Sequence, residues 1–84
     1  MIRILIVDDE KPICDLIDMN LSASGYQCAA VQDGIAALRM IEEEAFDLIL
    51  LDIMLPGDDG YTILEQLKSM PSVKDVPVIM VTAK

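Results

Sequence analysis

The stretch Ile4-Leu5-Ile6-Val7-Asp8-Asp9-Glu10 is an apolar run followed at once by three acidic residues. It belongs to a segment, residues 2–7, that is rich in Ile, Leu and Val and alternates little. This pattern is typical of a parallel strand that is buried on both faces of a sheet. Pro12 suits the first turn of a helix, because its missing N–H is no loss there. The sequence therefore predicts a strand over residues 2–7 that leads through an acidic turn into a helix.

The rest of the chain repeats this order of strand and helix. Short apolar segments at residues 26–31, 48–51 and 78–81 have the length of strands. Parallel strands joined by helices cross over right-handedly and form an open twisted sheet with helices on its faces. We therefore expect an α/β fold in the order β-α-β-α-β-α-β. Helical spacing predicts that the following residues face the sheet: Ile13, Leu16, Ile17 and Leu21 in the first helix, Ala37, Leu38 and Ile41 in the second, and Tyr61, Leu64 and Leu67 in the third.

Composition narrows the class of protein. Eighty-four residues suffice for one small domain. Hydrophobic residues make up 54% of the chain, yet no apolar run approaches the roughly 18 residues of a membrane span. The formal charge of −9 would repel a phosphate backbone, so we expect no direct nucleic acid binding by this segment. With no secretory signal after Met1, these features favour a cytoplasmic location and no membrane contact.

The reactive side chains are few. The chain has no histidine, which removes Ser-His and Cys-His nucleophile pairs and the usual zinc ligands. Cys14 and Cys28 could form one disulfide, but a reducing cytoplasm favours buried thiols. Any chemistry must therefore come from carboxylates, most of which, like the run Glu42-Glu43-Glu44, are interpreted as a solvated surface.

Three aspartates and a threonine stand at strand ends. Asp8 and Asp9 follow the first strand, Asp52 follows the third and Thr82 ends the fourth. Chemistry in such sheets collects outside the carboxyl ends of the strands. Carboxylates drawn together repel one another, so the site favours either the uptake of a proton or a bound cation. Oxygen ligands suit Mg²⁺ or Mn²⁺, and a carboxylate can attack phosphorus to form an acyl phosphate. The alternative is that Asp8 caps a helix and Asp52 merely ends a strand.

Longer motifs carry a family resemblance. The stretch 4–10 quoted above, Leu50-Leu51-Asp52-Ile53-Met54-Leu55-Pro56-Gly57-Asp58-Asp59-Gly60 and Pro77-Val78-Ile79-Met80-Val81-Thr82-Ala83 resemble three consecutive signatures of bacterial response-regulator receiver domains. Asp33-Gly34 with Ala37-Leu38 resembles a fourth, weaker one. The resemblance spans the whole chain in order. It implies a flavodoxin-like parallel sheet of strand order 2-1-3-4-5, of which this chain supplies 2-1-3-4.

The resemblance also implies roles for the acidic residues. Asp52 matches the phosphoacceptor position. Mg²⁺ (or Mn²⁺) is expected to be held by Asp8, Asp9, Asp52 and the backbone carbonyl of Met54. Asp9 is the expected direct ligand, whereas Asp8 is expected to act partly through water.

Further residues match the switch and the partner surfaces of the family. Thr82 resembles the switch hydroxyl that reaches toward the phosphoryl group, and Ala83 is the small neighbour that leaves space for it. With no histidine of its own, the chain would need a partner phosphohistidine, which the family implies is a sensor histidine kinase. Leu55-Pro56-Gly57 followed by Asp59-Gly60 is similar to receivers attached to winged-helix DNA-binding domains, which points to transcription regulation by a longer protein.

The resemblance is incomplete at its end. Receivers continue with a fourth helix, a fifth strand and a fifth helix, so residues 1–84 are expected to form the N-terminal two thirds of such a domain. The family's lysine at the end of the fifth strand has no counterpart in this chain, and Lys84 is interpreted as a solvated charge. The strand over residues 78–81 is expected to be an open apolar edge that invites self-association.

Three functions compete. The first is a phosphoacceptor signalling domain that catalyses at most its own phosphoryl transfer and hydrolysis, and so is not an enzyme in the ordinary sense. The second is a structural module that self-associates and does not switch. The third is a Mg²⁺-dependent phosphohydrolase with an aspartyl nucleophile, which usually has a second acid where this chain has Met54. Phosphorylation by a small phosphodonor with Mg²⁺ distinguishes the first from the second.

Overall fold

Strands and helices alternate along the chain in a computed structural model that describes residues 1–53, 55 and 60–81. The elements are β1 (Arg3–Val7), α1 (Lys11–Ala23), β2 (Gln27–Val31), α2 (Gly34–Glu43), β3 (Leu48–Asp52), α3 (Gly60–Ser69) and β4 (Val78–Val81).

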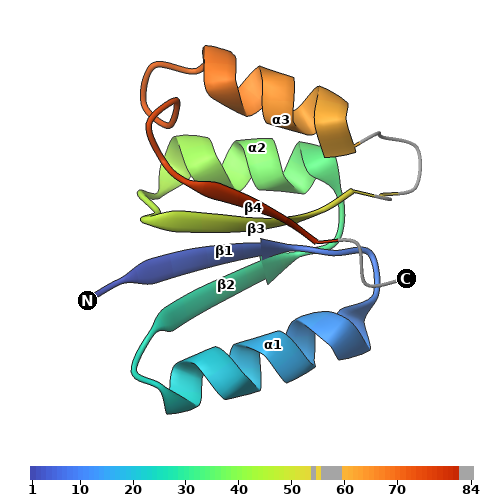
Figure 1. Ribbon diagram of the computed structural model, residues 1–84, viewed down its shortest axis with the longest axis vertical. Helices are drawn as coiled ribbons and strands as arrows, with labels where there is room; N and C mark the ends of the chain where they lie inside the picture. Colours follow the sequence, from blue (N-terminus) through green and yellow to red (C-terminus); the bar gives the residue numbers. More distant parts are fainter. Residues whose placement is uncertain (54, 56–59, 82–84) are drawn as a thin grey trace.

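All four strands form one parallel sheet in the order β2-β1-β3-β4. Helix α1 covers one face, and α2 and α3 cover the other (Figure 1). The predicted α/β fold and the predicted strand order 2-1-3-4 are confirmed. Because every strand runs in the same direction, the carboxyl ends of β1, β2, β3 and β4 lie at one edge of the molecule.

Two hydrophobic clusters lie on either side of the sheet. Ile4 and Ile6 of β1 point toward α1, whereas Leu5 and Val7 point toward α2 and α3. Successive side chains of a strand alternate between faces, so a strand covered on both sides is apolar throughout. This explains the unbroken apolar run from which the strand was predicted.

The buried face of α1 differs from the prediction. Leu16 is 56% exposed, whereas Cys14 is buried, with Ile17 and Leu21 packed against the same cluster. Each residue advances an α-helix by about 100°, which puts position 16 about 200° from position 14. The expectation that Leu16 faces the sheet is therefore wrong, because Cys14 occupies the centre of that face.

The buried face of α3 is also corrected. Tyr61 is 56% exposed, and Ile63 is buried instead. Leu67 is buried and Leu64 packs at the margin of the same cluster, as predicted. In α2, by contrast, Ala37 and Ile41 are buried as predicted. The prediction that Tyr61 faces the sheet is therefore wrong, because this aromatic residue lies at the exposed edge of the apolar stripe of α3.

Local signals set the helix ends. Gly25 has a positive φ of 95° just after α1, and its N–H donates to the Ser22 carbonyl at 3.0 Å. The Tyr26 N–H donates to the Leu21 carbonyl at 3.2 Å, which completes a Schellman end that satisfies the last carbonyls of the helix. Asp33 caps α2, because its Oδ1 accepts the Ala36 N–H at 2.7 Å.

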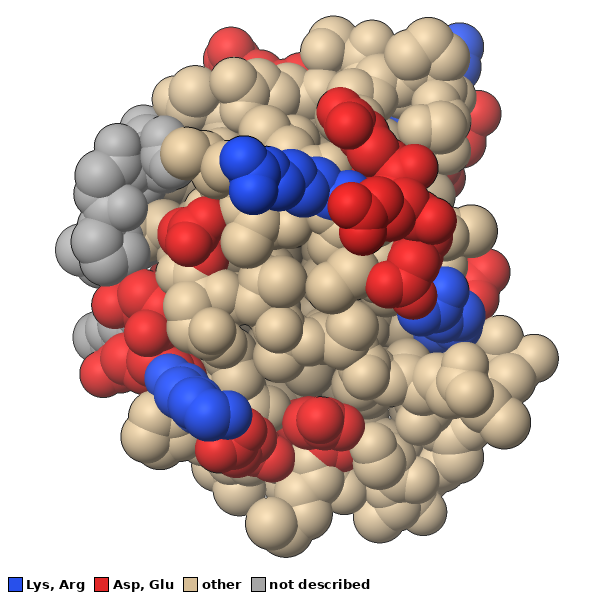
Figure 2. Space-filling model, turned by 180° about the vertical axis from the view of Figure 1, so that it is seen from behind, with Lys and Arg blue, Asp and Glu red and all other residues tan. Residues whose placement is uncertain are grey.

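The surface is acidic, in keeping with the net charge of −9. Figure 2 shows acidic side chains spread over the face opposite to that of Figure 1, with scattered Lys and Arg between them. Among the helices that the structure describes, none is long and apolar enough to cross a membrane.

Candidate functional site

Three aspartates meet at the carboxyl edge of the sheet. Val7 of β1 lies opposite Leu51 of β3, so the residues that follow, Asp8 and Asp52, are neighbours at the ends of adjacent strands. One carboxylate oxygen each from Asp8, Asp9 and Asp52 lies within 4.8 Å of the other two. The predicted convergence of the acidic residues is confirmed, although Asp52 is the last residue of β3 and does not follow it.

Burial raises the free-energy cost of keeping these carboxylates charged. Asp8 is 4% exposed and Asp52 is 2% exposed, while Asp9 is partly exposed. Removing a carboxylate from water costs free energy unless hydrogen bonds or a cation compensate it. The Glu10 N–H donates a hydrogen bond of this kind to Asp8 Oδ1 at 2.9 Å. A set of oxygen donors of this kind fits a hard divalent cation such as Mg²⁺.

A buried thiol lies directly behind Asp8. Cys14 Sγ donates to the Asp8 carbonyl at 3.4 Å and accepts the Nε2–H of Gln32 at 3.8 Å. Burial raises the pKa of the Cys14 thiol above its ordinary value, so Cys14 carries the proton that this bond requires. Sequence reasoning predicted a buried thiol but missed this contact. Its only signal was the place of Cys14 in the first turn of the helix that follows the acidic turn.

The backbone beyond Asp52 holds the start of α3. The Ile53 N–H donates to the Val81 carbonyl of β4 at 3.2 Å, and the Gly60 N–H donates to the Ile53 carbonyl at 3.0 Å. These two bonds tie the end of β3 to its neighbouring strand and to the helix that comes next.

Several predicted site residues lie outside the described part of the chain. They are Met54, whose carbonyl was expected in the metal site, and the switch residues Thr82 and Ala83. Their roles stay predictions.

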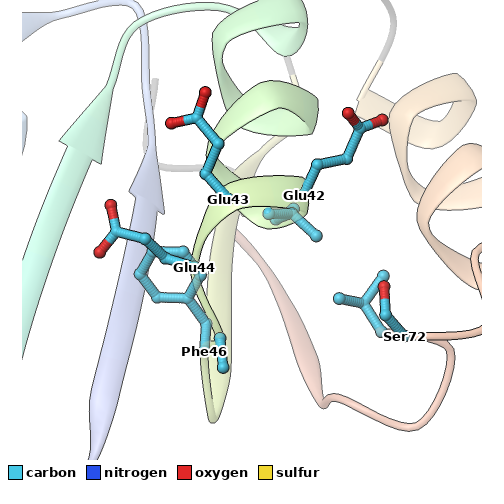
Figure 3. Close-up of a pocket in the computed structure, with 8 residues that line it drawn as sticks. Glu42, Glu43, Glu44, Phe46 and Ser72 are labelled. Carbon is cyan, nitrogen blue, oxygen red and sulfur yellow. The ribbon is translucent and has the colours of Figure 1, made fainter.

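A groove lies at the other end of the sheet. It has a volume of about 270 Å³ and lies between the end of α2 and the connection from α3 to β4. Figure 3 shows Glu42, Glu43 and Glu44 around it, with Phe46 on one side and Ser72 on the other. The predicted charge run at a helix end is confirmed. Because β3 and β4 begin beside this groove and end at the aspartates, the groove is separate from the acidic site.

The family comparison bears on the acidic site. Residues 4–84 match the family model of the response regulator receiver domain. The chain belongs to this family. A receiver domain is a part of response regulators and of some histidine kinases, and the fold and the position of the acidic cluster agree with the resemblance found in the sequence.

Solved structures support the same assignment. The N-terminal domain of a response regulator receiver protein from Methanoculleus marisnigri is 39% identical with a TM-score of 0.93, over 98% of this chain and 67% of that one. The receiver domain of a sensor histidine kinase from Pseudomonas aeruginosa, solved with magnesium in its active-site cleft, is 35% identical with a TM-score of 0.90, over 98% and 67%. The response regulator TrrA from Thermotoga maritima, solved with Mg²⁺ and BeF, is 34% identical with a TM-score of 0.92, over 100% and 71%. This chain thus spans about two thirds of each.

Proposed function

We propose that this receiver domain accepts a phosphoryl group on Asp52 as part of a two-component signalling system. The observation that carries the proposal is the meeting of Asp8, Asp9 and Asp52 within 4.8 Å at the carboxyl edge of the sheet. A lone carboxylate at a strand end would suit a structural role. Three in one place cost free energy through mutual repulsion, and a site for a cation and a phosphoryl group accounts for that cost.

The donor set fits a magnesium site. Asp9 and Asp52 would hold Mg²⁺ directly, with Asp8 acting partly through water and with the Met54 carbonyl as a further ligand. When bound, Mg²⁺ neutralises negative charge on the attacking carboxylate and on the transferred group. Mn²⁺ has the same preference for oxygen ligands and would serve as well.

The chemical step transfers one phosphoryl group from a histidine side chain of the partner to the Asp52 carboxylate. A carboxylate oxygen of Asp52 attacks the phosphorus of a phosphohistidine on the partner. An O–P bond forms, the N–P bond breaks, and its electron pair stays on the imidazole nitrogen, which takes up a proton. The product on this chain is an acyl phosphate. Apart from this transfer and the later hydrolysis of the acyl phosphate, we propose no enzymatic activity.

The proposed partner is a sensor histidine kinase. The chain has no histidine of its own to carry the phosphoryl group, and one similar structure is a receiver domain that belongs to a sensor histidine kinase. The structural likeness extends to receivers of response regulators as well as of kinases. A winged-helix output domain and a cytoplasmic location stay predictions from the sequence.

An exposed strand favours a second candidate function, self-association. Ile79 of β4 is 51% exposed, and among the described strands β4 pairs only with β3. An open apolar edge can pair with the same edge of a second copy. On this alternative the chain would be a structural module without phosphorylation switching.

Phosphorylation of the folded chain decides between these functions. We expect acetyl phosphate with Mg²⁺ to add the mass of one phosphoryl group to the intact protein, and Asp52→Asn to abolish that addition while the fold persists. Asp33→Asn is the matched control, because Asn replaces Asp equally well as the helix cap at position 33. Uptake that survives in folded Asp52→Asn would place the nucleophile elsewhere. No uptake by the folded wild type would favour the structural module.

A further inference from the structure

Three residues, one from α1 and two from the turns after β1 and β2, are linked by contacts behind the acidic cluster. Gln32, which follows β2, donates from Nε2 to Cys14 Sγ of α1 at 3.8 Å. Cys14 Sγ in turn donates to the carbonyl of Asp8, which follows β1, at 3.4 Å. These contacts link the exposed residue Gln32, through the buried thiol of Cys14, to the backbone of Asp8 in the acidic turn.

The contact falls on the peptide group that joins two of the site's carboxylate residues. The register of β1 with β2 and with β3 ends at Val7, so the peptide between Asp8 and Asp9 lies just past the paired part of the sheet. A peptide group is planar, so the oxygen of Asp8 and the N–H of Asp9 turn together. Holding this oxygen therefore fixes the direction in which the chain leaves Asp8 and enters Asp9.

We propose that Cys14, oriented by Gln32, is a positioning residue for the metal site. Its thiol holds the peptide plane between Asp8 and Asp9 and thereby sets the relative placement of their carboxylates. The inference rests on the proposed function, because it assumes that these carboxylates bind a divalent cation.

Two further hydrogen bonds of Asp8 act on its N–H and its side chain. The Asp8 N–H donates to the Val31 carbonyl at 3.1 Å, which anchors the residue on its β2 side. Asp8 Oδ1 accepts the Glu10 N–H at 2.9 Å, which orients the side chain. The thiol contact acts on the carbonyl, the group that links Asp8 to Asp9. A thiol is a weak donor, but Cys14 is buried, so water does not compete for the bond.

Packing alone would give a different pattern of mutational effects. Cys14 also fills space beside Ile4 and Ile6, and a methyl group in its place would remove part of that packing as well as the donor. Serine keeps a donor at the same place. Cys28 packs against the same cluster beside Ile4, at the other end of β1 from Asp8, so its replacement by alanine measures the loss of a thiol from this cluster away from the acidic turn.

The test compares Mg²⁺ binding by four folded proteins: the wild type, Cys14→Ala, Cys14→Ser and Cys28→Ala. We expect Cys14→Ala to raise the Mg²⁺ dissociation constant by about threefold to tenfold, as the loss of one hydrogen bond implies. Cys14→Ser and Cys28→Ala should bind Mg²⁺ within about twofold of the wild type. Isothermal titration gives the constants, and urea unfolding of each variant separates stability from affinity.

A spectroscopic readout reports the contact directly. Loss of the thiol bond should move the ¹³C resonance of the Asp8 carbonyl and the ¹⁵N resonance of Asp9, which share one peptide group. Cys14→Ala should move both before any Mg²⁺ is added, whereas Cys28→Ala should leave both in place. A purely structural role for Cys14 would lower stability without this localised change.

The outcomes separate the inference from the proposed function. If the folded wild type binds no Mg²⁺, the proposed function fails. If the wild type binds Mg²⁺ and Cys14→Ala matches Cys28→Ala in affinity and in both resonances, the positioning role is overturned. Should Cys14→Ala not fold, Gln32→Ala decides, because Gln32 is exposed. Weaker Mg²⁺ binding with a shifted Asp8 carbonyl supports the role, and no change in either refutes it.

Discussion

Gly60 lies directly against the backbone of Ile53, the residue that follows Asp52. A Cβ at position 60 would stand 2.6 Å from Ile53 Cα, 2.7 Å from the Asp52 carbonyl oxygen and 2.9 Å from the Ile53 carbonyl oxygen. All three are backbone atoms, which cannot move aside as the end of a flexible side chain can. The missing side chain thus allows α3 to begin in contact with the strand end that carries the proposed phosphoacceptor.

Gly60→Ala should therefore damage both the fold and the site. We expect a loss of about 1–3 kcal/mol in the free energy of unfolding, the usual range for overpacking, and shifted amide resonances at Asp52 and Ile53. Gly25→Ala is the control. It strains a backbone with φ of +95° in open space and should cost about 1 kcal/mol while leaving the resonances of Asp52 and Ile53 in place. Equal effects of the two substitutions on these resonances would contradict the proposed contact.

Arg3 links the start of β1 to the segment before β3 through several contacts. Its guanidinium lies 4.9 Å from the centre of the Phe46 ring, donates from Nη1 to the Ala45 carbonyl at 3.1 Å and forms an ion pair with Glu44. The ion pair is about a third exposed on each side, so solvent screens it and it is worth only a fraction of a kcal/mol. We expect Arg3→Ala to lower the free energy of unfolding by about 1–2 kcal/mol, mostly through the lost ring and carbonyl contacts.

Two further variants test this account of Arg3 in urea unfolding. Arg3→Lys keeps the charge but cannot reproduce the planar contacts, so it should recover less than half of the loss. Lys11→Ala removes the exposed pair of Lys11 with Asp15 and should change stability by no more than about 0.5 kcal/mol. If Arg3→Ala cost no more than Lys11→Ala, the contacts with Phe46 and Ala45 would contribute nothing measurable.

The sheet and the acidic cluster were predictable because local patterns fix both. Apolar segments of strand length separated by helical spacing allow few arrangements, and parallel strands bring their carboxyl ends to one edge. Asp8 and Asp52 could be placed together from the sequence without knowledge of any contact. They are neighbours because Val7 pairs with Leu51, and this proximity could be predicted from where the two strands end in the sequence.

The predictions that were wrong or missing concern side chains whose positions depend on packing between elements. Leu16 and Cys14 both satisfy a helical pattern, and which of them faces the sheet depends on how α1 is rotated about its axis. Tyr61 was misassigned for the same reason. The contact of Cys14 with Asp8 requires the helix and the turn in their final places, and no spacing rule contains it.

Cys28 should make stability depend on pH in the alkaline range. Burial and the nearby negative charge of Asp18 raise the pKa of its thiol above the ordinary value of 9.0, despite an opposing hydrogen bond with Ser22. The folded state then keeps the proton to a higher pH than the unfolded state does. The corresponding stability is fully present below pH 9 and is lost as the pH rises from there through the folded pKa.

Cys28→Ala should therefore flatten the alkaline fall in the free energy of unfolding. The difference in slope from the wild type cannot exceed about 1.4 kcal/mol per pH unit, the value for one proton. Below about pH 8 the free energies of unfolding of the two proteins should change in parallel with pH, because the thiol is protonated in both the folded and the unfolded state there. Denaturant titrations across the pH range measure this, with thiolate absorbance as an independent check. Parallel curves at every pH would show that the thiol titrates alike in both states.

The edge strand β4 should make this chain of 84 residues associate. Its four residues, Val78–Val81, are all apolar, and Ile79 is half exposed. Covering about 400 Å² of such surface is worth roughly 10 kcal/mol at about 25 cal/mol per Å². Lost translational and rotational freedom costs a comparable amount, and repulsion between copies of charge −9 opposes pairing further. The gain exceeds these costs by only a few kcal/mol, which corresponds to a dissociation constant of about a millimolar. We therefore expect a weak dimer that forms near millimolar concentration and is favoured by salt, which screens the repulsion.

Light scattering over a concentration series, at low and at moderate salt, measures this equilibrium. Ile79→Lys places a charge on the edge and should keep the protein monomeric, since a charged edge strand resists pairing. Ile35→Lys is the matched control, because Ile35 is also an isoleucine and is 63% exposed but lies on α2. The control should associate as the wild type does, or slightly more, because one added positive charge reduces the net repulsion in both variants. Dimers that persist in Ile79→Lys would move the interface away from β4, and a wild type that stays monomeric throughout would show that charge repulsion and lost freedom outweigh the apolar edge.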